Sequence, residues 1–359
     1  AVHEKNFKIL LITTENADSP WIDRLPASVK HLDFGKFAVR LQHEKRVELL
    51  ARILIQSTAQ TIHNINSRDG WEVFKNFGTQ LGAMGKCLFS SVFSQEQIAE
   101  NIYFGYSPAY ISTSHSHLIQ VFCDTKWYPQ TQIQLTGLQN FFQTLYFPFL
   151  GKLNSYSASC EKSAPILWAS RVAPEKLPQL LCQIAKSLPN EIFHVYGEVE
   201  LSCKSELKAL EKLHNIKYFR KYDSFNKIAT LDSYKAFLYT TKFDGLPNVL
   251  IEAIASGLPV IAYDVGGVGE LIHTDCLLSH SDTFEENLQK IRDILDSPEL
   301  LYNSWKYSHD ILKSRHSWTS FVNTLEQTKG YFPTLSQEEY WKKYYSNPRV
   351  LSKPDHESV

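Results

Sequence analysis

Residues 244–252 have the types and spacing needed to bind a phosphate ester of a sugar. Asp244 is followed by Gly245, Leu246, Pro247 and Asn248, and a second carboxylate, Glu252, comes eight positions after Asp244. The glycine and the proline lie between a predicted strand and a predicted helix, so the unpaired N–H groups of the helix N-terminus attract an anion. The two carboxylates suit the hydroxyl pairs of a sugar and a ribose, because one carboxylate accepts two hydrogen bonds.

Two further features could serve the same ligand. Arg171 and Lys176, five positions apart, supply positive charge after an earlier predicted strand. Gly266 and Gly267 form a tight loop after a later strand, where the lack of side chains lets a ligand approach the backbone. Each feature also has a plain structural interpretation, as a helix cap, a solvated charge or an ordinary turn. The occurrence of all these features in this order along the chain favours a binding site over the separate structural interpretations.

The elements that position these residues alternate between strands and helices. In the second half, strands are predicted at Ile166–Ala169, Ile192–Tyr196, Ile216–Phe219, Tyr234–Thr240 and Pro259–Tyr263, and helices at Pro178–Ser187, Ser205–Leu213 and Asn248–Ser256. In the first half, strands are predicted at Phe7–Thr14, Lys86–Val92, Leu118–Cys123 and Gln143–Phe147, a helix at Glu44–Gln56 and a polar loop over Thr61–Ser67. This alternation predicts an α/β fold with two doubly wound Rossmann-like domains facing across a cleft.

A chain of 359 residues is long enough for two such domains. We expect residues 1–155 to form the N-terminal, acceptor-side domain and residues 156–325 the C-terminal, donor-side domain. Residues 326–359 are expected to form a tail or helix that packs back on the N-terminal domain.

Composition narrows the function classes. The formal net charge is -1, with 37 Lys and Arg against 38 Asp and Glu, so the chain as a whole does not attract nucleic acid. Apolar runs fall short of the roughly 20 residues that cross a bilayer. The six cysteines show no CxxC and no close pairing, which fits reduced thiols in a cytoplasmic protein.

The string from Asp244 to Glu252 resembles the signature of family 4 retaining glycosyltransferases, which have the GT-B fold. Their motif is an acidic residue, Gly, any residue and Pro, with a Glu eight positions after the first acid. The segment Ser170–Lys176 resembles the family loop in which an Arg and a Lys clasp the donor diphosphate. The resemblance implies that Arg171 and Lys176 neutralise the leaving diphosphate.

The resemblance also implies roles for the neighbouring residues. Glu252 would hold the ribose, Asp244 would meet the donor sugar, and the backbone from Gly245 to Asn248 would contact the sugar or phosphate. Gly197, directly after a predicted strand, would approach the nucleotide, although a strand-terminating turn explains it equally well.

The chain departs from the family pattern in two ways. The first acid is Asp244 where the family commonly has Glu, so its side chain is one methylene shorter. The Gly-Gly loop that follows the family's first strand is absent after Phe7–Thr14. We therefore expect Phe7–Thr14 to correspond to the family's second strand, with the first βα unit lying upstream in a longer polypeptide.

Candidate residues in the first half rest on weaker signals. His63, with Asn64 and Asn66, is placed in a loop at a strand end, where it would contact the donor sugar or the acceptor; a hydrogen-bonded histidine in a polar turn is the alternative. Asp124 and Trp127 would line an acceptor platform, and packing is the alternative. His115 and His117 lack a third ligand, so no metal is expected.

The resemblance implies a metal-independent enzyme that moves a sugar from a nucleotide-diphosphate sugar to a hydroxyl acceptor, with retention and without a further cofactor. The expected partners are that donor and a glycan or lipid-linked glycan acceptor. The expected setting is bacterial polysaccharide, O-antigen or capsule assembly at the inner face of the cell membrane. The alternatives are a nucleotide-sugar-binding pseudoenzyme or module of a larger assembly, and a sugar-nucleotide epimerase on the same fold.

Overall fold

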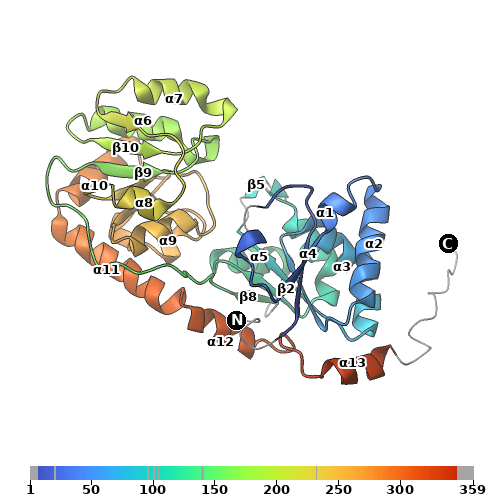
Figure 1. The fold of residues 1–359 in the computed structure, drawn as a ribbon. Helices are drawn as coiled ribbons and strands as arrows, with labels where there is room; N and C mark the ends of the chain where they lie inside the picture. Colours follow the sequence, from blue (N-terminus) through green and yellow to red (C-terminus); the bar gives the residue numbers. More distant parts are fainter. Residues whose placement is uncertain are drawn as a thin grey trace.

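The computed structural model describes residues 7–345, apart from residues 20, 21, 95, 96, 100, 101, 104, 139, 140 and 232. Two α/β domains lie next to each other, and the last helices of the chain return from the second domain to the first (Figure 1). Every ladder within the two larger sheets is parallel, so the predicted doubly wound architecture is confirmed.

The C-terminal domain contains a six-stranded sheet in the order β11-β10-β9-β12-β13-β14. Its strands are β9 (Ile166–Ala169), β10 (Phe193–Tyr196), β11 (Ile216–Tyr218), β12 (Phe237–Tyr239), β13 (Val260–Tyr263) and β14 (Leu277–Leu278). Counted from β9, this is the order 3-2-1-4-5-6 of doubly wound nucleotide-binding folds. The order reverses between β9 and β12, and a ligand crevice is expected at the carboxyl ends of these two strands.

Helices bury this sheet on both faces, which explains its continuous apolar strands. All four residues of β9, β10 and β13 are buried. The helices are α6 (Pro178–Ser187), α7 (Lys204–Glu211), α8 (Phe225–Ala229), α9 (Asn248–Ala255), α10 (Phe284–Leu295) and α11 (Pro298–Arg315). The central helix α9 directly follows Pro247 and buries five of its eight residues.

The N-terminal domain has six parallel strands in two groups. One sheet has the order β3-β4-β7-β8, and a separate pair joins β1 to β2. These strands are β1 (Ile9–Thr13), β2 (Val29–Asp33), β3 (Thr61–Ile65), β4 (Cys87–Val92), β7 (Gln120–Cys123) and β8 (Phe142–Thr144). Within the described residues, no ladder joins β1 to β3, although Thr14 and Ser67, just beyond the two strands, share a hydroxyl–hydroxyl hydrogen bond of 2.7 Å. The expectation of an upstream βα unit stays a prediction.

Five α-helices of the N-terminal domain lie in the described residues, and the first of them is a short helix before β3. They are α1 (Phe34–Phe37), α2 (His43–Gln56), α3 (Arg68–Ala83), α4 (Ser107–Ser114) and α5 (Trp127–Thr136). An antiparallel hairpin joins β5 (Gln97–Ala99) to β6 (Ile102–Tyr103). The strand β2 and this hairpin were not predicted, and the segment predicted as a polar loop is instead strand β3, because Ile62 and Asn64 point into the core.

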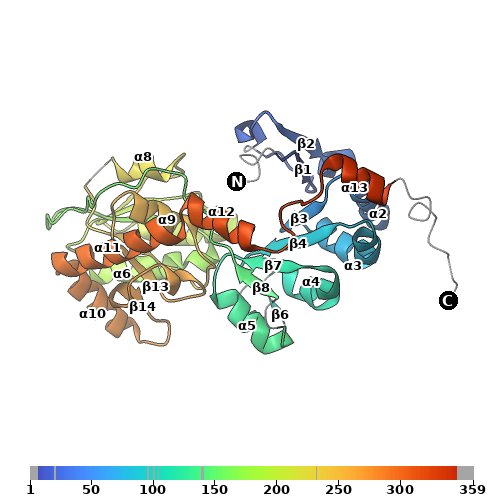
Figure 2. The same ribbon diagram turned by 90° about the horizontal axis from the view of Figure 1, so that it is seen from below.

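The end of the chain crosses back to the N-terminal domain. Helix α12 (Trp318–Gln327) continues the direction of α11, and α13 (Gln337–Tyr344) lies against the N-terminal domain near α2 (Figure 2). Leu325 and Tyr331 complete a buried cluster with Phe89 of β4 and Phe122 of β7. The Tyr340 hydroxyl donates to the backbone oxygen of Met84 at 2.5 Å.

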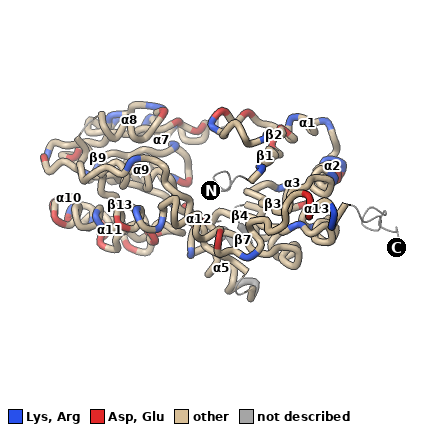
Figure 3. Tube along the Cα trace, turned by 60° about the horizontal axis from the view of Figure 1, so that its bottom comes forward, with Lys and Arg blue, Asp and Glu red and all other residues tan. Residues whose placement is uncertain are grey.

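Charged residues of both signs are distributed along the chain in both domains and are not gathered on one element (Figure 3). Within the residues that the structure describes, no helix combines the length and the apolar character needed to cross a membrane.

Candidate functional site

A pocket of about 420 Å³ lies where the strand order reverses, and both domains line it. The C-terminal domain contributes the segment after β9, the end of β12 and the turn before α9. The N-terminal domain contributes one wall from the loops after β4 and β7. The lining residues are Phe93, Ser94, Asp124, Ala169, Ser170, Arg171, Lys176, Tyr222, Tyr239, Asp244, Gly245, Leu246, Pro247, Asn248 and Val249.

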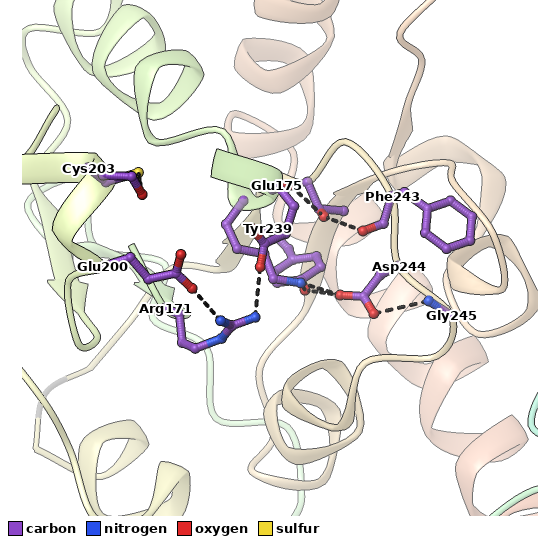
Figure 4. Close-up of polar contacts among 11 residues, drawn as sticks. Arg171, Glu175, Glu200, Cys203, Tyr239, Phe243, Asp244 and Gly245 are labelled. Carbon is purple, nitrogen blue, oxygen red and sulfur yellow. Dashed lines mark hydrogen bonds and ion pairs between the residues drawn. The ribbon is translucent and has the colours of Figure 1, made fainter. Parts of the chain in front are cut away.

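Lys176 and Asp244 meet in the middle of this pocket. The Lys176 ammonium forms an ion pair with the Asp244 carboxylate and donates to the Tyr239 hydroxyl at 2.8 Å. The same hydroxyl donates to Asp244 at 2.6 Å, and burial together with this carboxylate raises the pKa of Tyr239 well above its usual value. The other carboxylate oxygen of Asp244 accepts from the Gly245 N–H at 3.0 Å. A positive charge and a carboxylate are thus fixed side by side at the start of the turn (Figure 4).

The loop that carries Lys176 is fixed to the end of β12. The Thr240 hydroxyl donates to the Lys176 backbone oxygen at 2.8 Å, and the Thr241 hydroxyl and Lys242 N–H donate to the Glu175 backbone oxygen. Buried Trp168 in turn donates to Thr240 at 3.0 Å. Lys176 is therefore held rigidly, and only 12% of its side chain is exposed.

Arg171 lies at the outer edge of the same pocket and is 61% exposed. Its guanidinium bridges two carboxylates, those of Glu175 at 2.7 Å and of Glu200 (Figure 4). Both basic residues that the sequence assigns to a diphosphate thus already have acidic partners. A bound anion has to replace or join these partners.

The opposite wall is formed by Asp124, which directly follows β7. One of its oxygens accepts from the Ser94 N–H and hydroxyl, both at 3.0 Å. Burial raises the pKa of Asp124 to about 6, although the hydrogen bonds from Ser94 oppose that shift. A Cβ added at Gly245 would lie 2.9 Å from the second oxygen of Asp124, so this carboxylate directly faces the turn of the other domain.

Glu252 lies about one helical turn into α9, behind the turn. Its side chain is half-buried, and burial raises its pKa. Tyr222 lines the pocket close enough for the Glu252 charge to raise the pKa of its hydroxyl, which burial has already raised. Glu252 therefore lies near Tyr222 but is not itself one of the lining residues.

Of the predicted glycines, Gly245 lines the pocket, whereas Gly197, Gly266 and Gly267 have packing positions next to it. Gly266 has a φ of +53°, and a Cβ there would lie 1.9 Å from the Asp244 backbone oxygen. Gly267 donates to the Gly245 oxygen at 2.9 Å. Gly197 has a φ of +151°, and a Cβ would lie 1.7 Å from the Ser170 oxygen. These glycines let neighbouring loops support the two segments that carry Arg171 and Asp244.

The first-half candidates from β3 lie away from the pocket. His63 is central in the strand and contacts the Ser91 hydroxyl at 2.7 Å and the Tyr331 hydroxyl at 2.9 Å; burial lowers its pKa to about 4. Asn64 is buried and accepts from Ser67 N–H. Asn66, with a φ of +50°, accepts from the Tyr106 hydroxyl through its backbone oxygen.

Trp127 also lies outside the pocket. Its ring packs against Phe243 of the other domain, with centroids 5.3 Å apart.

Seven of the lining residues were not predicted as site residues: Phe93, Ser94, Ala169, Ser170, Tyr222, Tyr239 and Val249. Tyr239 ends a predicted strand five positions before Asp244, and such a strand-end position carries the signal for it. Ser94 and Tyr222 lie in loops that carry no recognisable pattern, because their role depends on contacts between distant segments.

Sequence comparisons match mainly the C-terminal domain, which carries one wall of this pocket. Residues 157–309 match the model of the family Glycosyl transferases group 1. The O-antigen biosynthesis glycosyltransferase WbnH of Escherichia coli is 27% identical over 132 residues, which are 36% of this chain and 37% of that protein. The GtfA subunit of a UDP-N-acetylglucosamine–peptide N-acetylglucosaminyltransferase of Streptococcus agalactiae is 32% identical over 121 residues, 32% of this chain and 24% of that protein. The matched part spans little more than a third of these relatives at most.

Solved structures resemble the whole chain at lower identity. HepE of Anabaena, solved with UDP, has a TM-score of 0.68 and 14% identity, with 89% of this chain and 91% of that chain covered. Sucrose-phosphate synthase of Thermosynechococcus elongatus has a TM-score of 0.69 and 14% identity, with 91% and 89% covered. These likenesses confirm the expected two-domain GT-B fold.

Proposed function

We propose that the chain moves a sugar from a nucleoside-diphosphate sugar to a hydroxyl acceptor with retention at the anomeric carbon, and the match of residues 157–309 to the model of the group 1 glycosyl transferases supports this proposal. The observation that carries this proposal is the group Lys176, Asp244 and Tyr239 at the start of the α9 turn, with Asp124 opposite. A cation and free helix N–H groups suit a diphosphate, and facing carboxylates suit sugar hydroxyls.

The proposed reaction needs stabilisation of a leaving diphosphate. As the bond from the anomeric carbon to the phosphate oxygen breaks, negative charge grows on that oxygen, and Lys176 with the N–H groups at the start of α9 stabilises it without a metal. Arg171 neutralises the outer phosphate. The acceptor oxygen attacks on the same face of the sugar, and its proton passes to the leaving phosphate.

The remaining site residues take supporting roles in this proposal. Glu252 holds the ribose, and Asp244 and the backbone from Gly245 to Asn248 orient the donor sugar. Asp124 binds a hydroxyl of the acceptor from the other domain. Closure of the two domains over the bound donor excludes water that would hydrolyse it.

We place this activity in bacterial polysaccharide or O-antigen assembly at the cytoplasmic face of the membrane, supported by the O-antigen relatives. The acceptor is proposed to be a glycan or a lipid-linked glycan. A second candidate is a nucleotide-sugar-binding protein without turnover. The pairing of both basic side chains with carboxylates favours it, because these partners neutralise positive charge that would stabilise a leaving diphosphate.

A thermal-shift screen against UDP, GDP, ADP and TDP sugars tests the proposal. A ligand at about 100 times its Kd stabilises the protein by about 2.7 kcal/mol. Stabilisation by one nucleotide class, followed by transfer of its sugar to an acceptor extract, supports a transferase. NMR of the product should then show that the anomeric configuration of the donor is retained. Stabilisation without turnover supports the second candidate, and no stabilisation by any nucleotide contradicts both.

A further inference from the structure

Glu270 is the one charged residue of the loop after β13 that reaches the other domain in the described contacts. One of its carboxylate oxygens accepts from the backbone N–H of Lys126 at 2.8 Å and of Trp127 at 3.0 Å. These N–H groups start helix α5 of the N-terminal domain. A carboxylate at a helix N-terminus forms charge-assisted hydrogen bonds and interacts favourably with the helix dipole.

The other groups of Glu270 hold the connections between the domains. Its second carboxylate oxygen accepts from the Tyr146 hydroxyl at 2.5 Å, and Tyr146 lies at the start of the segment that links the domains. Its backbone oxygen accepts from Arg315 at 2.6 Å, at the end of α11. The Arg315 guanidinium lies 4.9 Å from the centre of the Tyr146 ring. Glu270 thus contacts α5, the start of the segment that links the domains and the end of α11.

These contacts lie close to the two faces of the pocket. Asp124 comes two residues before Lys126, and Gly267, in the same loop as Glu270, binds the Gly245 backbone. A Cβ on Gly267 would lie 2.3 Å from a methyl carbon of Thr125, so the two loops touch. Movement of Glu270 relative to α5 would therefore change the separation between Asp124 and the Asp244 turn.

The linker side of this seam has two further hydrogen bonds, from the His316 ring to the Phe147 oxygen and from the Phe149 N–H to the His316 oxygen, both at 2.9 Å. Next to α5, the contact beside Glu270 is a ring contact. The rings of Trp127 and Phe243 pack at 5.3 Å, and packed rings can slide while they keep much of their contact. Hydrogen bonds weaken steeply when their angle or length changes. The Glu270 carboxylate hydrogen-bonds to the start of α5, two residues beyond Asp124, and can therefore fix this wall relative to the other domain.

We propose that Glu270 is a positioning residue that holds the domains at the separation at which Asp124 faces the Asp244–Gly245 turn. This inference rests on the proposed function for its catalytic consequence, whereas its structural consequence does not. Loss of the carboxylate opens the cleft and moves the acceptor wall away from the donor wall. The donor wall itself stays intact, because its residues all belong to the C-terminal domain.

The test compares Glu270→Ala with Glu270→Gln, which keeps one oxygen for the α5 N–H groups. The control is Glu285→Gln, an exposed carboxylate in the first turn of α10. Small-angle X-ray scattering without ligand should give a larger radius of gyration for Glu270→Ala, a smaller increase for Glu270→Gln and no change for the control. An unchanged radius for Glu270→Ala, with only a lower melting temperature, would show that Glu270 is merely a helix cap and would overturn the proposal.

A second measurement uses the donor nucleotide identified in the thermal-shift screen. Glu270→Ala should bind this nucleotide within threefold of the parent Kd, and kcat should fall at least tenfold with little change in the donor KM. Equal losses in nucleotide affinity and kcat would contradict a positioning role. The scattering result does not depend on any substrate. A larger radius of gyration for Glu270→Ala would therefore show that Glu270 fixes the domain separation even if no sugar transfer is found.

Discussion

Replacement of Lys176 by methionine removes the buried positive charge of the pocket and keeps a side chain of similar length. In the proposed complex, the Lys176 ammonium contacts the donor diphosphate through a charged hydrogen bond, which typically contributes about 1.5–3 kcal/mol. That loss corresponds to a roughly 10- to 150-fold increase in Kd. Only 12% of this side chain is exposed, so solvent screening does little to reduce the effect.

The ion pair with Asp244 determines where in this range the result should lie. In the free protein Lys176 already binds Asp244 and Tyr239, so part of its interaction with the donor replaces an existing one. After Lys176→Met, however, the Asp244 carboxylate is left unpaired beside an incoming anion, and this repulsion adds to the loss. We therefore expect the increase in Kd for Lys176→Met to lie near the upper end of this range. The Kd of the double variant Lys176→Met/Asp244→Asn should be closer to that of the parent protein.

Isothermal titration calorimetry with the nucleoside diphosphate found in the screen measures these changes. Arg171→Met gives the internal comparison, since an ion pair as exposed as that of Arg171 contributes about 0.2–1 kcal/mol, or roughly 1.4- to 5-fold in Kd. Lys186→Met, at an exposed position in the last turn of α6, is the neutral control. If Lys176→Met bound the nucleotide as tightly as the parent chain, or more tightly than Arg171→Met does, the assignment of Lys176 to the diphosphate would be wrong.

Three further substitutions test other parts of the site. Glu200→Gln should tighten nucleotide binding by roughly 1.4- to 5-fold in calorimetry, because one exposed acidic partner of Arg171 no longer competes; weaker binding would mean that Glu200 orients the guanidinium. Glu252→Ala should weaken binding of a ribonucleotide but leave a 2′,3′-dideoxynucleotide unaffected, and an equal loss for both would exclude a contact to the ribose. Asp124→Asn should raise the free energy of unfolding above pH 6 by about 3 kcal/mol, since the folded carboxyl has a pKa of about 6 instead of 3.8. That gain should shrink as the pH falls from 6 to below 4 in urea unfolding, and a gain independent of pH would contradict it.

The C-terminal domain was largely predictable from the sequence because its signals are local. The apolar runs of β9, β10 and β13 have helices between them, and the turn from Asp244 to Asn248 is read directly from Gly and Pro. The structure brings Arg171, Lys176 and Asp244 into one pocket, as their positions after parallel strands imply. The acidic partners Glu175 and Glu200 were not predicted, since a charge on a loop carries no pattern that names its partner.

The N-terminal domain was less predictable because its key contacts join distant segments. His63 and Asn64 looked like loop residues in a polar sequence, but strand pairing with β4 and the Tyr331 hydroxyl accommodate them in the interior. Tyr331 lies 268 positions from His63, so no local pattern could show that pairing. Asp124 directly follows a buried strand and lines the pocket, whereas its predicted role on an acceptor platform stays a prediction.

The return of the chain also determines which fragments of it can be studied separately. Phe89 and Phe122, on the central strands of the N-terminal sheet, are covered by Leu325 and Tyr331 from the far end of the sequence. A recombinant fragment cut after residue 155 would therefore present an uncovered aromatic surface to water and tend to aggregate. An expression design that joins residues 318–345 to that fragment through a flexible linker would restore the missing cover and give a soluble acceptor-side half.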